Sequence, residues 1–294
     1  MGLSSSDRPL VFAHRGSSHA LPEHTLGAYL RAVDEGADGL ECDVRLTRDR
    51  HLVCLHDRRL ERTSNGRGPV SEHTLAQLNE LDFGSWHPGW ATGEEEPLLD
   101  SADVERWPGA APTGSAADER WPGAAPTGSA ARVLTLERLL DTALAAGRPI
   151  RLLVETKHPT RYGSEVEERL VDVLRRYGLD GTGTAGVRVT MMSFSMAAVR
   201  RVRHLAPDLP TVLLVDLLPP WLRTGRLPAG IPAAGPGVRL LRNHPRLAAR
   251  IREQGNQLYV WTVNTDEDID LVLALGVDGI ISDRPRYVLD RLGR

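Results

Sequence analysis

Short apolar segments that alternate with helical patterns run through most of the chain, and this alternation restricts the fold most strongly. It is typical of repeated strand–helix units built around a parallel sheet. The first unit has a strand at residues 10–14, a helix that begins near Leu26, and a second strand at residues 39–44. Apolar residues three, four and seven positions after Leu26 lie on one face of this helix, so it is expected to pack against the sheet.

The next strand-like segment, residues 51–56, follows too soon to be a third parallel strand. Only residues 45–50 separate it from the second strand, whereas parallel neighbours need a connection of about a dozen residues or more. We therefore expect a β-hairpin at residues 45–56, then a turn and a short helix from Ser71 to about Leu81. These elements begin an insertion, residues 45–132, within one domain that spans residues 8–294.

Regular alternation resumes with a helix at residues 135–144 and six further strands. The eight parallel strands are predicted at residues 10–14, 39–44, 151–157, 188–194, 211–216, 237–242, 258–263 and 279–283. Eight parallel strands with intervening helices predict a (β/α)8 TIM barrel, in which catalytic residues lie at the carboxyl ends of the strands. A doubly wound open sheet is the alternative fold.

A direct repeat rich in Pro, Gly and Ala lies inside the insertion. Residues 105–117 recur identically as residues 119–131, and neither copy has a periodic apolar face. Two copies are too few for a solenoid. Because lengthening a surface loop costs little free energy, we interpret residues 105–131 as a duplicated loop and expect it to be poorly ordered.

The composition excludes several classes of protein. The chain is 41% hydrophobic and 26% charged, with a net charge of −3, which argues against a disordered chain and against a basic surface for nucleic acid. No segment has the roughly 18 consecutive apolar residues of a transmembrane helix, and the N-terminus lacks the features of a signal peptide. We therefore expect a cytoplasmic protein. Two cysteines, Cys42 and Cys54, are too few for a disulfide framework, and the oligomeric state is left open.

Charged side chains occupy alternate positions in two predicted strands. Glu41 and Asp43 lie two residues apart, so both carboxylates point to the same face of the sheet. Buried carboxylates a few ångströms apart repel each other unless a cation compensates them, which favours a metal over two solvated acids. Glu155 and Lys157 repeat this geometry on the next parallel strand. Three carboxylates suit a hard divalent cation such as Mg²⁺ or Ca²⁺, and the ammonium group suits a phosphate.

Two histidines are expected at the same rim of the barrel. His14 ends the first strand and is followed by Arg15 and a glycine, a composition suited to a phosphate site. His56 ends the hairpin. Two imidazoles at one site allow one to act as a general base while the other protonates a leaving oxygen. Trp261 ends a later strand, where it either packs in the barrel or forms an aromatic wall for the substrate.

In order and spacing, these residues resemble the motifs of the glycerophosphodiester phosphodiesterase family, a family of phospholipase C-like TIM barrels. The resemblance rests on His14-Arg15-Gly16, Pro22-Glu23-His24-Thr25, residues 36–44, His56-Asp57, residues 63–66, residues 84–86, Glu155-Thr156-Lys157, Ser193-Phe194, residues 261–264 and Asp283-Arg284-Pro285. Two features depart from the family pattern. The family usually has Asn where this chain has His24, and the repeat separates two segments that the family usually joins.

The resemblance implies a set of roles and a reaction. It implies that Glu41, Asp43 and Glu155 bind one divalent cation (Mg²⁺ or Ca²⁺, with Mn²⁺ a further candidate), that His14 and His56 are the acid and the base, and that Arg15 and Lys157 hold the phosphate. The implied reaction is hydrolysis of a small-molecule glycerophosphodiester to sn-glycerol 3-phosphate and an alcohol. A lyase that stops at a cyclic phosphate, as in similar phospholipases, is one alternative. A non-catalytic barrel that binds glycerophosphodiesters is the other.

Overall fold

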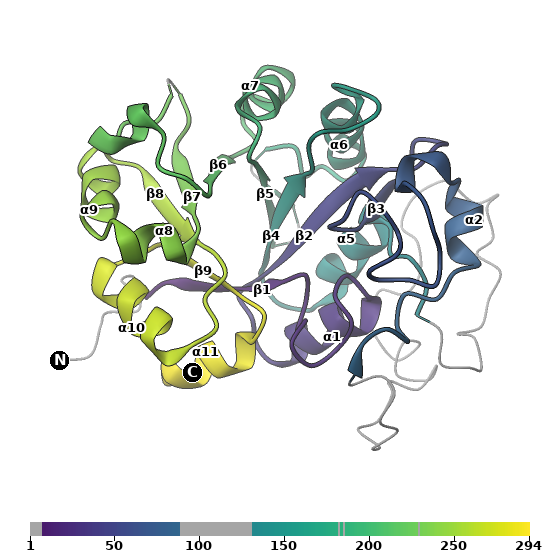
Figure 1. Ribbon diagram of the computed structural model, residues 1–294, viewed down its shortest axis with the longest axis horizontal. Helices are drawn as coiled ribbons and strands as arrows, with labels where there is room; N and C mark the ends of the chain where they lie inside the picture. Colours follow the sequence, from purple (N-terminus) through teal and green to yellow (C-terminus); the bar gives the residue numbers. More distant parts are fainter. Residues whose placement is uncertain (1–7, 89–130, 182, 185, 229) are drawn as a thin grey trace.

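The computed structural model describes residues 8–88, 131–181, 183–184, 186–228 and 230–294. Its centre is a parallel barrel formed by β1 (Leu10–His14), β2 (Gly39–Leu46), β4 (Ile150–Thr156), β5 (Val187–Ser193), β6 (Thr211–Val215), β7 (Ala233–Pro236), β8 (Gln257–Val260) and β9 (Gly279–Ser282). Strand β1 pairs with both β2 and β9, and these two pairings close the sheet. The predicted (β/α)8 barrel is therefore confirmed, and the open sheet is excluded (Figure 1).

Helices surround the barrel (Figure 1). They are α1 (Leu26–Asp34), α5 (Leu136–Ala145), α6 (Glu165–Arg176), α7 (Met196–Leu205), α8 (Val238–Asn243), α9 (Arg246–Glu253), α10 (Asp266–Leu275) and α11 (Pro285–Arg291). Four of them begin after a hydroxyl side chain that accepts a hydrogen bond from a backbone N–H of the first turn, namely Thr25, Thr135, Ser195 and Thr265. Such caps satisfy N–H groups that have no partner within the helix. None of the described helices has the length and hydrophobicity to span a membrane.

One predicted strand is wrong. We expected a strand at residues 237–242, but Val238–Asn243 forms helix α8, and the strand at this place is β7, Ala233–Pro236. The apolar residues Val238, Leu240 and Leu241 are buried on a helix face instead. The true strand consists of Ala, Gly and Pro, residue types that rarely form strands, so its composition gives no strand signal.

The first part of the insertion packs on the side of the barrel. The predicted hairpin is confirmed, since β3 (Leu52–Cys54) runs antiparallel to β2. The predicted continuous helix from Ser71 to Leu81 is wrong: a 3-10 turn η1 (Val70–Glu72) precedes a short helix α2 (Leu75–Asn79). Thr74 caps α2 through a reciprocal pair of hydrogen bonds with Gln77, and this cap fixes a new helix start. Most of the repeat, residues 105–130, lies outside the described residues, so its predicted poor order stays a prediction.

The inside of the barrel changes from apolar to charged along the strand direction. Its apolar part is a cluster formed by Phe12, Leu153, Met192, Val212, Leu214, Ala233, Tyr259 and Ile281. Two and four residues beyond Leu153 on the same face come Glu155 and Lys157, and beyond Phe12 comes His14. Position 39 must be glycine here, because a Cβ atom would lie 2.5 Å from the Phe12 ring. The strand alternation thus places charged groups at the carboxyl ends, above a filled apolar floor.

Candidate active site

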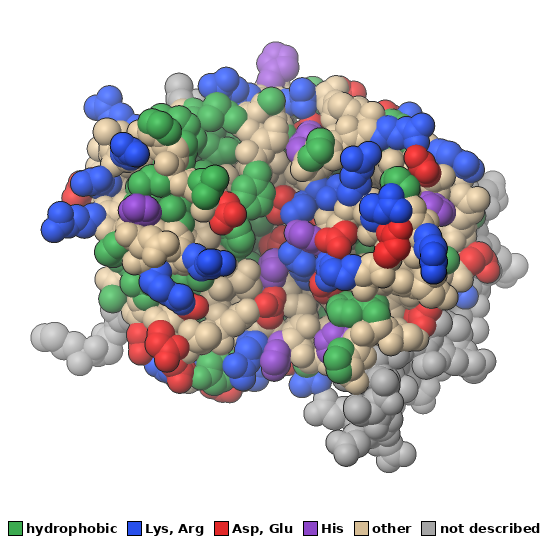
Figure 2. All heavy atoms as spheres, in the orientation of Figure 1, with side chains coloured by type: hydrophobic (Ala, Val, Ile, Leu, Met, Phe, Trp, Pro, Cys, Tyr) green, Lys and Arg blue, Asp and Glu red, His purple; other side chains and the backbone are tan. Residues whose placement is uncertain are grey.

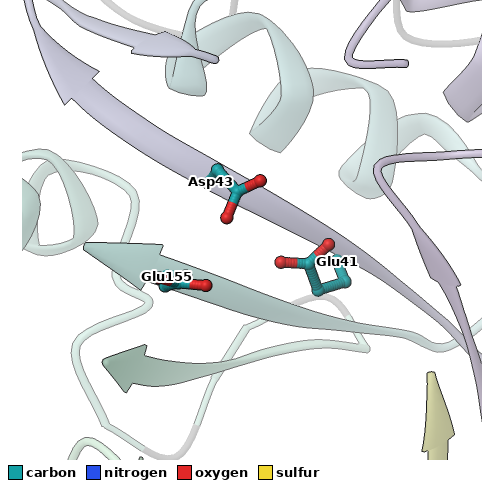
Figure 3. Close-up of side chains that lie close together, drawn as sticks. All are labelled: Glu41, Asp43 and Glu155. Atoms are coloured by element: carbon teal, nitrogen blue, oxygen red, sulfur yellow. The ribbon is translucent and has the colours of Figure 1, made fainter. Parts of the chain in front are cut away.

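Three carboxylates meet at the carboxyl ends of β2 and β4 (Figure 3). Glu41 and Asp43 come from β2, and Glu155 from β4, where it pairs in register with Asp43. One oxygen of each carboxylate lies within 4.8 Å of the others, and all three side chains are buried. This all-oxygen set, with three negative charges close together, fits a hard divalent cation such as Mg²⁺ or Ca²⁺.

The protein environment shifts the pKa values of the three carboxylates in different directions. Burial, together with repulsion from Asp43, raises the pKa of Glu41 well above its usual range and raises the pKa of Glu155 to about 8. Burial also acts on Asp43, but a hydrogen bond from His24 and the charge of Lys157 outweigh it and lower the Asp43 pKa. Burial and the charge of Asp43 therefore keep the two glutamates from ionising fully without a cation, which is the behaviour expected of metal ligands.

Two cations lie beside this cluster. Lys157 Nζ is 2.9 Å from Glu155 Oε1 and 3.3 Å from Asp43 Oδ1. Arg15 Nε is 3.1 Å from Asp43 Oδ2, but the angle gives no hydrogen bond, and this buried N–H has no other acceptor in the described part of the chain. A buried donor without an acceptor is costly, so Arg15 is suited to an incoming anion. The turn after Arg15 requires glycine, because a Cβ at Gly16 would lie 2.7 Å from the Ala28 backbone.

His14 is held by a carboxylate that directly follows the last strand, β9. Its Nδ1 lies 2.6 Å from Asp283 Oδ1, and its Nε2 lies 4.0 Å from Glu41 Oε2. Asp283 also accepts hydrogen bonds from Ser18 Oγ and Asn264 Nδ2. Burial raises the pKa of Asp283, but these hydrogen bonds outweigh it and lower the pKa to about 2. Asp283 is therefore ionised, keeps the proton on His14 Nδ1, and leaves Nε2 directed toward the carboxylates.

His56 is oriented in the same way from the hairpin. Its Nδ1 lies 2.6 Å from Asp57 Oδ1, so its Nε2 is also left for the substrate. Burial is the main cause that lowers the pKa of His56 to about 4, and the charges of Arg15 and Lys157 add to it. The imidazole is therefore neutral near pH 7.

Arg62 connects the two histidine-bearing loops, and the sequence analysis missed it. Its guanidinium donates two hydrogen bonds to Glu23, at 2.7 and 2.8 Å, and two to Asp57, at 2.7 and 3.3 Å. Glu23 in turn accepts from Arg15 Nη1 at 3.0 Å. One guanidinium thus orients both the partner of His56 and the partner of Arg15, although Arg62 is itself exposed.

His24, the departure from the family motif, is a buried neighbour of the cluster. Its Nε2 lies 3.0 Å from Asp43 Oδ2, and its Nδ1 lies 2.8 Å from Tyr29 Oη. Tyr29 Oη donates to the Glu41 backbone carbonyl at 3.0 Å. Both ring nitrogens of His24 thus face protein groups, which leaves none of them for a substrate.

Trp261 lies at the edge of the barrel mouth. Its Nε1 donates to the Gly235 carbonyl at 2.8 Å, and its ring packs edge-to-face on Phe194 with 5.4 Å between centroids. Phe194 is 44% exposed, and the Lys157 ammonium lies 6.0 Å from its ring. The two rings form an apolar wall beside the charged cluster, so both readings of Trp261, packing and substrate wall, agree with its position.

Comparison with known sequences gives a consistent set of relatives. The sequence profile of the "Glycerophosphoryl diester phosphodiesterase family" matches residues 14–287. A Mycobacterium tuberculosis protein named "Probable glycerophosphodiester phosphodiesterase 1" is 46% identical over 279 residues, which cover 94% of this chain and 90% of that protein. A Bacillus subtilis protein named "Glycerophosphodiester phosphodiesterase" is 33% identical over 287 residues, covering 96% of this chain and 86% of the relative.

Solved structures show the same architecture. An Oleispira antarctica phosphodiesterase, solved in complex with the product sn-glycerol-3-phosphate, superposes with a TM-score of 0.72 at 21% identity and covers 98% of both chains. A putative glycerophosphoryl diester phosphodiesterase from Silicibacter pomeroyi superposes with a TM-score of 0.70 at 25% identity, covering 99% of this chain and 96% of the other. The family predicted from the sequence motifs is confirmed: this chain belongs to the glycerophosphoryl diester phosphodiesterase family.

Proposed function

We propose that the protein hydrolyses a glycerophosphodiester to sn-glycerol 3-phosphate and an alcohol, with one divalent cation bound at the barrel mouth. The observation that carries this proposal is the buried cluster of Glu41, Asp43 and Glu155, with ligand atoms within 4.8 Å of one another. Two oriented imidazoles flank it. Names of relatives up to 46% identical support the substrate class.

The three carboxylates would hold the cation, and Mg²⁺, Ca²⁺ and Mn²⁺ all suit oxygen ligands. When bound, the cation supplies Lewis-acid stabilisation of negative charge on the phosphate. Arg15 and Lys157 provide the remaining positive charge from the protein. Because Arg15 has a buried N–H without an acceptor, binding a phosphate oxygen would remove an existing energetic cost.

The two histidines take opposite parts in proton transfer. His56 is neutral near pH 7 because burial lowers its pKa to about 4, so its Nε2 is suited to accept a proton from the nucleophile. His14 Nδ1 lies 2.6 Å from Asp283 Oδ1, which leaves its Nε2, 4.0 Å from Glu41 Oε2, facing the carboxylate cluster. Since His56 is assigned as the base, His14 Nε2 is assigned to donate a proton to the leaving alkoxide.

Leaving-group chemistry tests this assignment. A nitrophenolate leaves without protonation, whereas a glycerol alkoxide needs it. His14→Ala should therefore lose about 10²- to 10⁴-fold in kcat on glycerophosphoglycerol and much less on the nitrophenyl diester of glycerol 3-phosphate. His56→Ala should lose activity on both substrates. Equal losses on both substrates in His14→Ala would refute the assignment. Phosphorus NMR of the wild-type product separates the hydrolase from the lyase, because a lyase yields a cyclic ester.

Two further expectations stay predictions: the cytoplasmic location, and the division of the chain into a barrel with an insertion at residues 45–132. A binding barrel without catalysis would give no product with any glycerophosphodiester, so the same product analysis tests that alternative.

A further inference from the structure

A basic pocket lies beside the cluster of Glu41, Asp43 and Glu155, on the side of the insertion. It has a volume of about 330 Å³, counting the part open to solvent, and lies between β2, η1 and the loop from β4 to α6. Its polar lining residues are Arg45, Arg58, Ser71, Lys157, Thr160 and Arg161, and none of the described Asp or Glu residues lines it. Figure 2 shows Lys and Arg side chains gathered on this side of the molecule, over β2, β3 and β4.

Two arginines of this pocket, Arg45 and Arg58, make no direct contact with a described carboxylate, since neither has one at ion-pair distance. The Arg45 guanidinium donates only to a backbone carbonyl, that of His56, at 2.7 and 2.9 Å. Burial is the main cause that lowers the pKa of Arg45, and the charges of nearby Asp43, Glu155 and Asp57 act in the opposite direction. Arg161 has one exposed contact, 3.5 Å from Glu72.

The pocket is continuous with the proposed catalytic residues. Arg45 lies two residues beyond Asp43 on β2, so it points to the same face of the strand. Lys157 lines the pocket and also contacts Asp43 and Glu155. A group in this pocket would therefore lie next to a phosphate held by Lys157. Arg45 and Arg58, which have no carboxylate at ion-pair distance among the described residues, are suited to bind a phosphate through paired N–H groups.

We propose that this pocket binds a second phosphate group, carried by the alcohol part of the substrate. This inference rests on the proposed function and deepens it, because it names a substrate class: glycerophosphodiesters whose alcohol is itself phosphorylated or phosphodiester-linked. Substrates of this class gain two or three ionic contacts that a neutral or cationic alcohol lacks. The pocket distinguishes these substrates from others when they bind, so we expect it to lower KM and to change kcat little.

Two substrates and two double variants test the proposal. Glycerophosphoglycerol has a neutral alcohol, and bis(glycerophospho)glycerol extends the same alcohol by a second phosphodiester. Arg58→Gln with Arg161→Gln removes two exposed pocket cations without touching the proposed catalytic residues. Arg59→Gln with Arg67→Gln is the control, because it removes the same charge from exposed arginines outside the pocket. Initial rates of glycerol 3-phosphate release give kcat and KM for each pair, corrected for the two cleavable bonds of the longer substrate.

Wild type and control are expected to have an approximately tenfold lower KM for the substrate with two phosphates, a factor that corresponds to ~1.4 kcal/mol. The pocket variant should lose this preference and keep its kcat/KM for glycerophosphoglycerol. Equal KM values for both substrates in the wild type would overturn the proposal. If inorganic phosphate inhibits wild type but not the pocket variant, while the substrates do not differ, the ligand is free phosphate and the substrate assignment is wrong. No hydrolysis of either substrate would instead contradict the proposed function itself.

Discussion

Replacing Asp283 by Asn tests how His14 is controlled. The Asp283 carboxylate accepts from His14 Nδ1 and Ser18 Oγ through one oxygen and from Asn264 Nδ2 through the other. Asn264 cannot rotate freely, since its Oδ1 already accepts from Ser282 Oγ and the backbone N–H of residue 283. The new amide must therefore place its oxygen toward Asn264 and its NH₂ group toward His14. Nδ1 of His14 then becomes an acceptor, and the proton moves to Nε2.

The size of the effect follows from this change. The variant loses a charge-assisted hydrogen bond of 2.6 Å, a contact worth ~1.5–3 kcal/mol. It also leaves His14 Nδ1 without a proton, so Nε2 can offer only the weakly acidic N–H of a neutral imidazole, and losing one acid or base costs about 10²- to 10⁴-fold in rate. We expect kcat on glycerophosphoglycerol to fall within this range.

Steady-state kinetics, with glycerol 3-phosphate as the measured product, checks this prediction. Metal affinity, measured by calorimetry on the same variant, should stay within a factor of about two, because Asp283 contacts none of the three carboxylates. Ser18→Ala is the matched control: it removes another hydrogen bond to Asp283 and leaves the charge in place, so its kcat should fall less than tenfold. A kcat for Asp283→Asn within threefold of wild type would refute the proposed control of His14.

Three further predictions follow from named contacts. Arg62→Ala removes four hydrogen bonds to two carboxylates and should lower kcat/KM about tenfold or more, with partial rescue in Arg62→Lys; an unchanged value would contradict its bridging role. Tyr29→Phe leaves His24 and the Glu41 carbonyl without their buried partner and should cost ~2–4 kcal/mol in urea unfolding, and a loss below ~0.5 kcal/mol would contradict this. Because the pKa of His56 is lowered to about 4, a neutral base persists in mild acid, so kcat/KM at saturating metal should fall only as the pH drops toward 4; a fall already centred near 6.5 would refute the base assignment.

The period of two along a strand explains why much of the cluster could be predicted. It placed Glu41 and Asp43 on one face, and Glu155 and Lys157 on one face, and the structure brings these four side chains together. Alternation depends only on local geometry, so a single sequence carries it. The strand prediction was wrong at β7. Its sequence, Ala-Ala-Gly-Pro, has no β-branched residue, whereas the helix after it has three apolar residues, which were mistaken for the strand.

Residues that act through long-range contacts could not be found in this way. His14 and Asp283 are 269 positions apart and meet only because β1 pairs with β9 and closes the barrel. Arg62 lies in an irregular segment, where no periodicity indicates which way a side chain points. The signal for Asp283 was its place just after the last strand, at the rim where catalytic groups gather. For Arg62, only its position soon after His56-Asp57 could have drawn attention to it.

Glu41, Asp43 and Glu155 are proposed to hold a cation that phosphodiester hydrolysis requires. Phosphorus NMR of glycerophosphoglycerol tests this proposal, first with enzyme stripped of metal by a chelator and then with Mg²⁺, Ca²⁺ or Mn²⁺ added in turn. We expect no reaction in the chelator and formation of the glycerol 3-phosphate monoester signal once a suitable ion is present, with Asp43→Asn failing to recover at the same metal concentration. Full hydrolysis by the chelated enzyme would show that the three carboxylates do not hold a cation that the reaction needs.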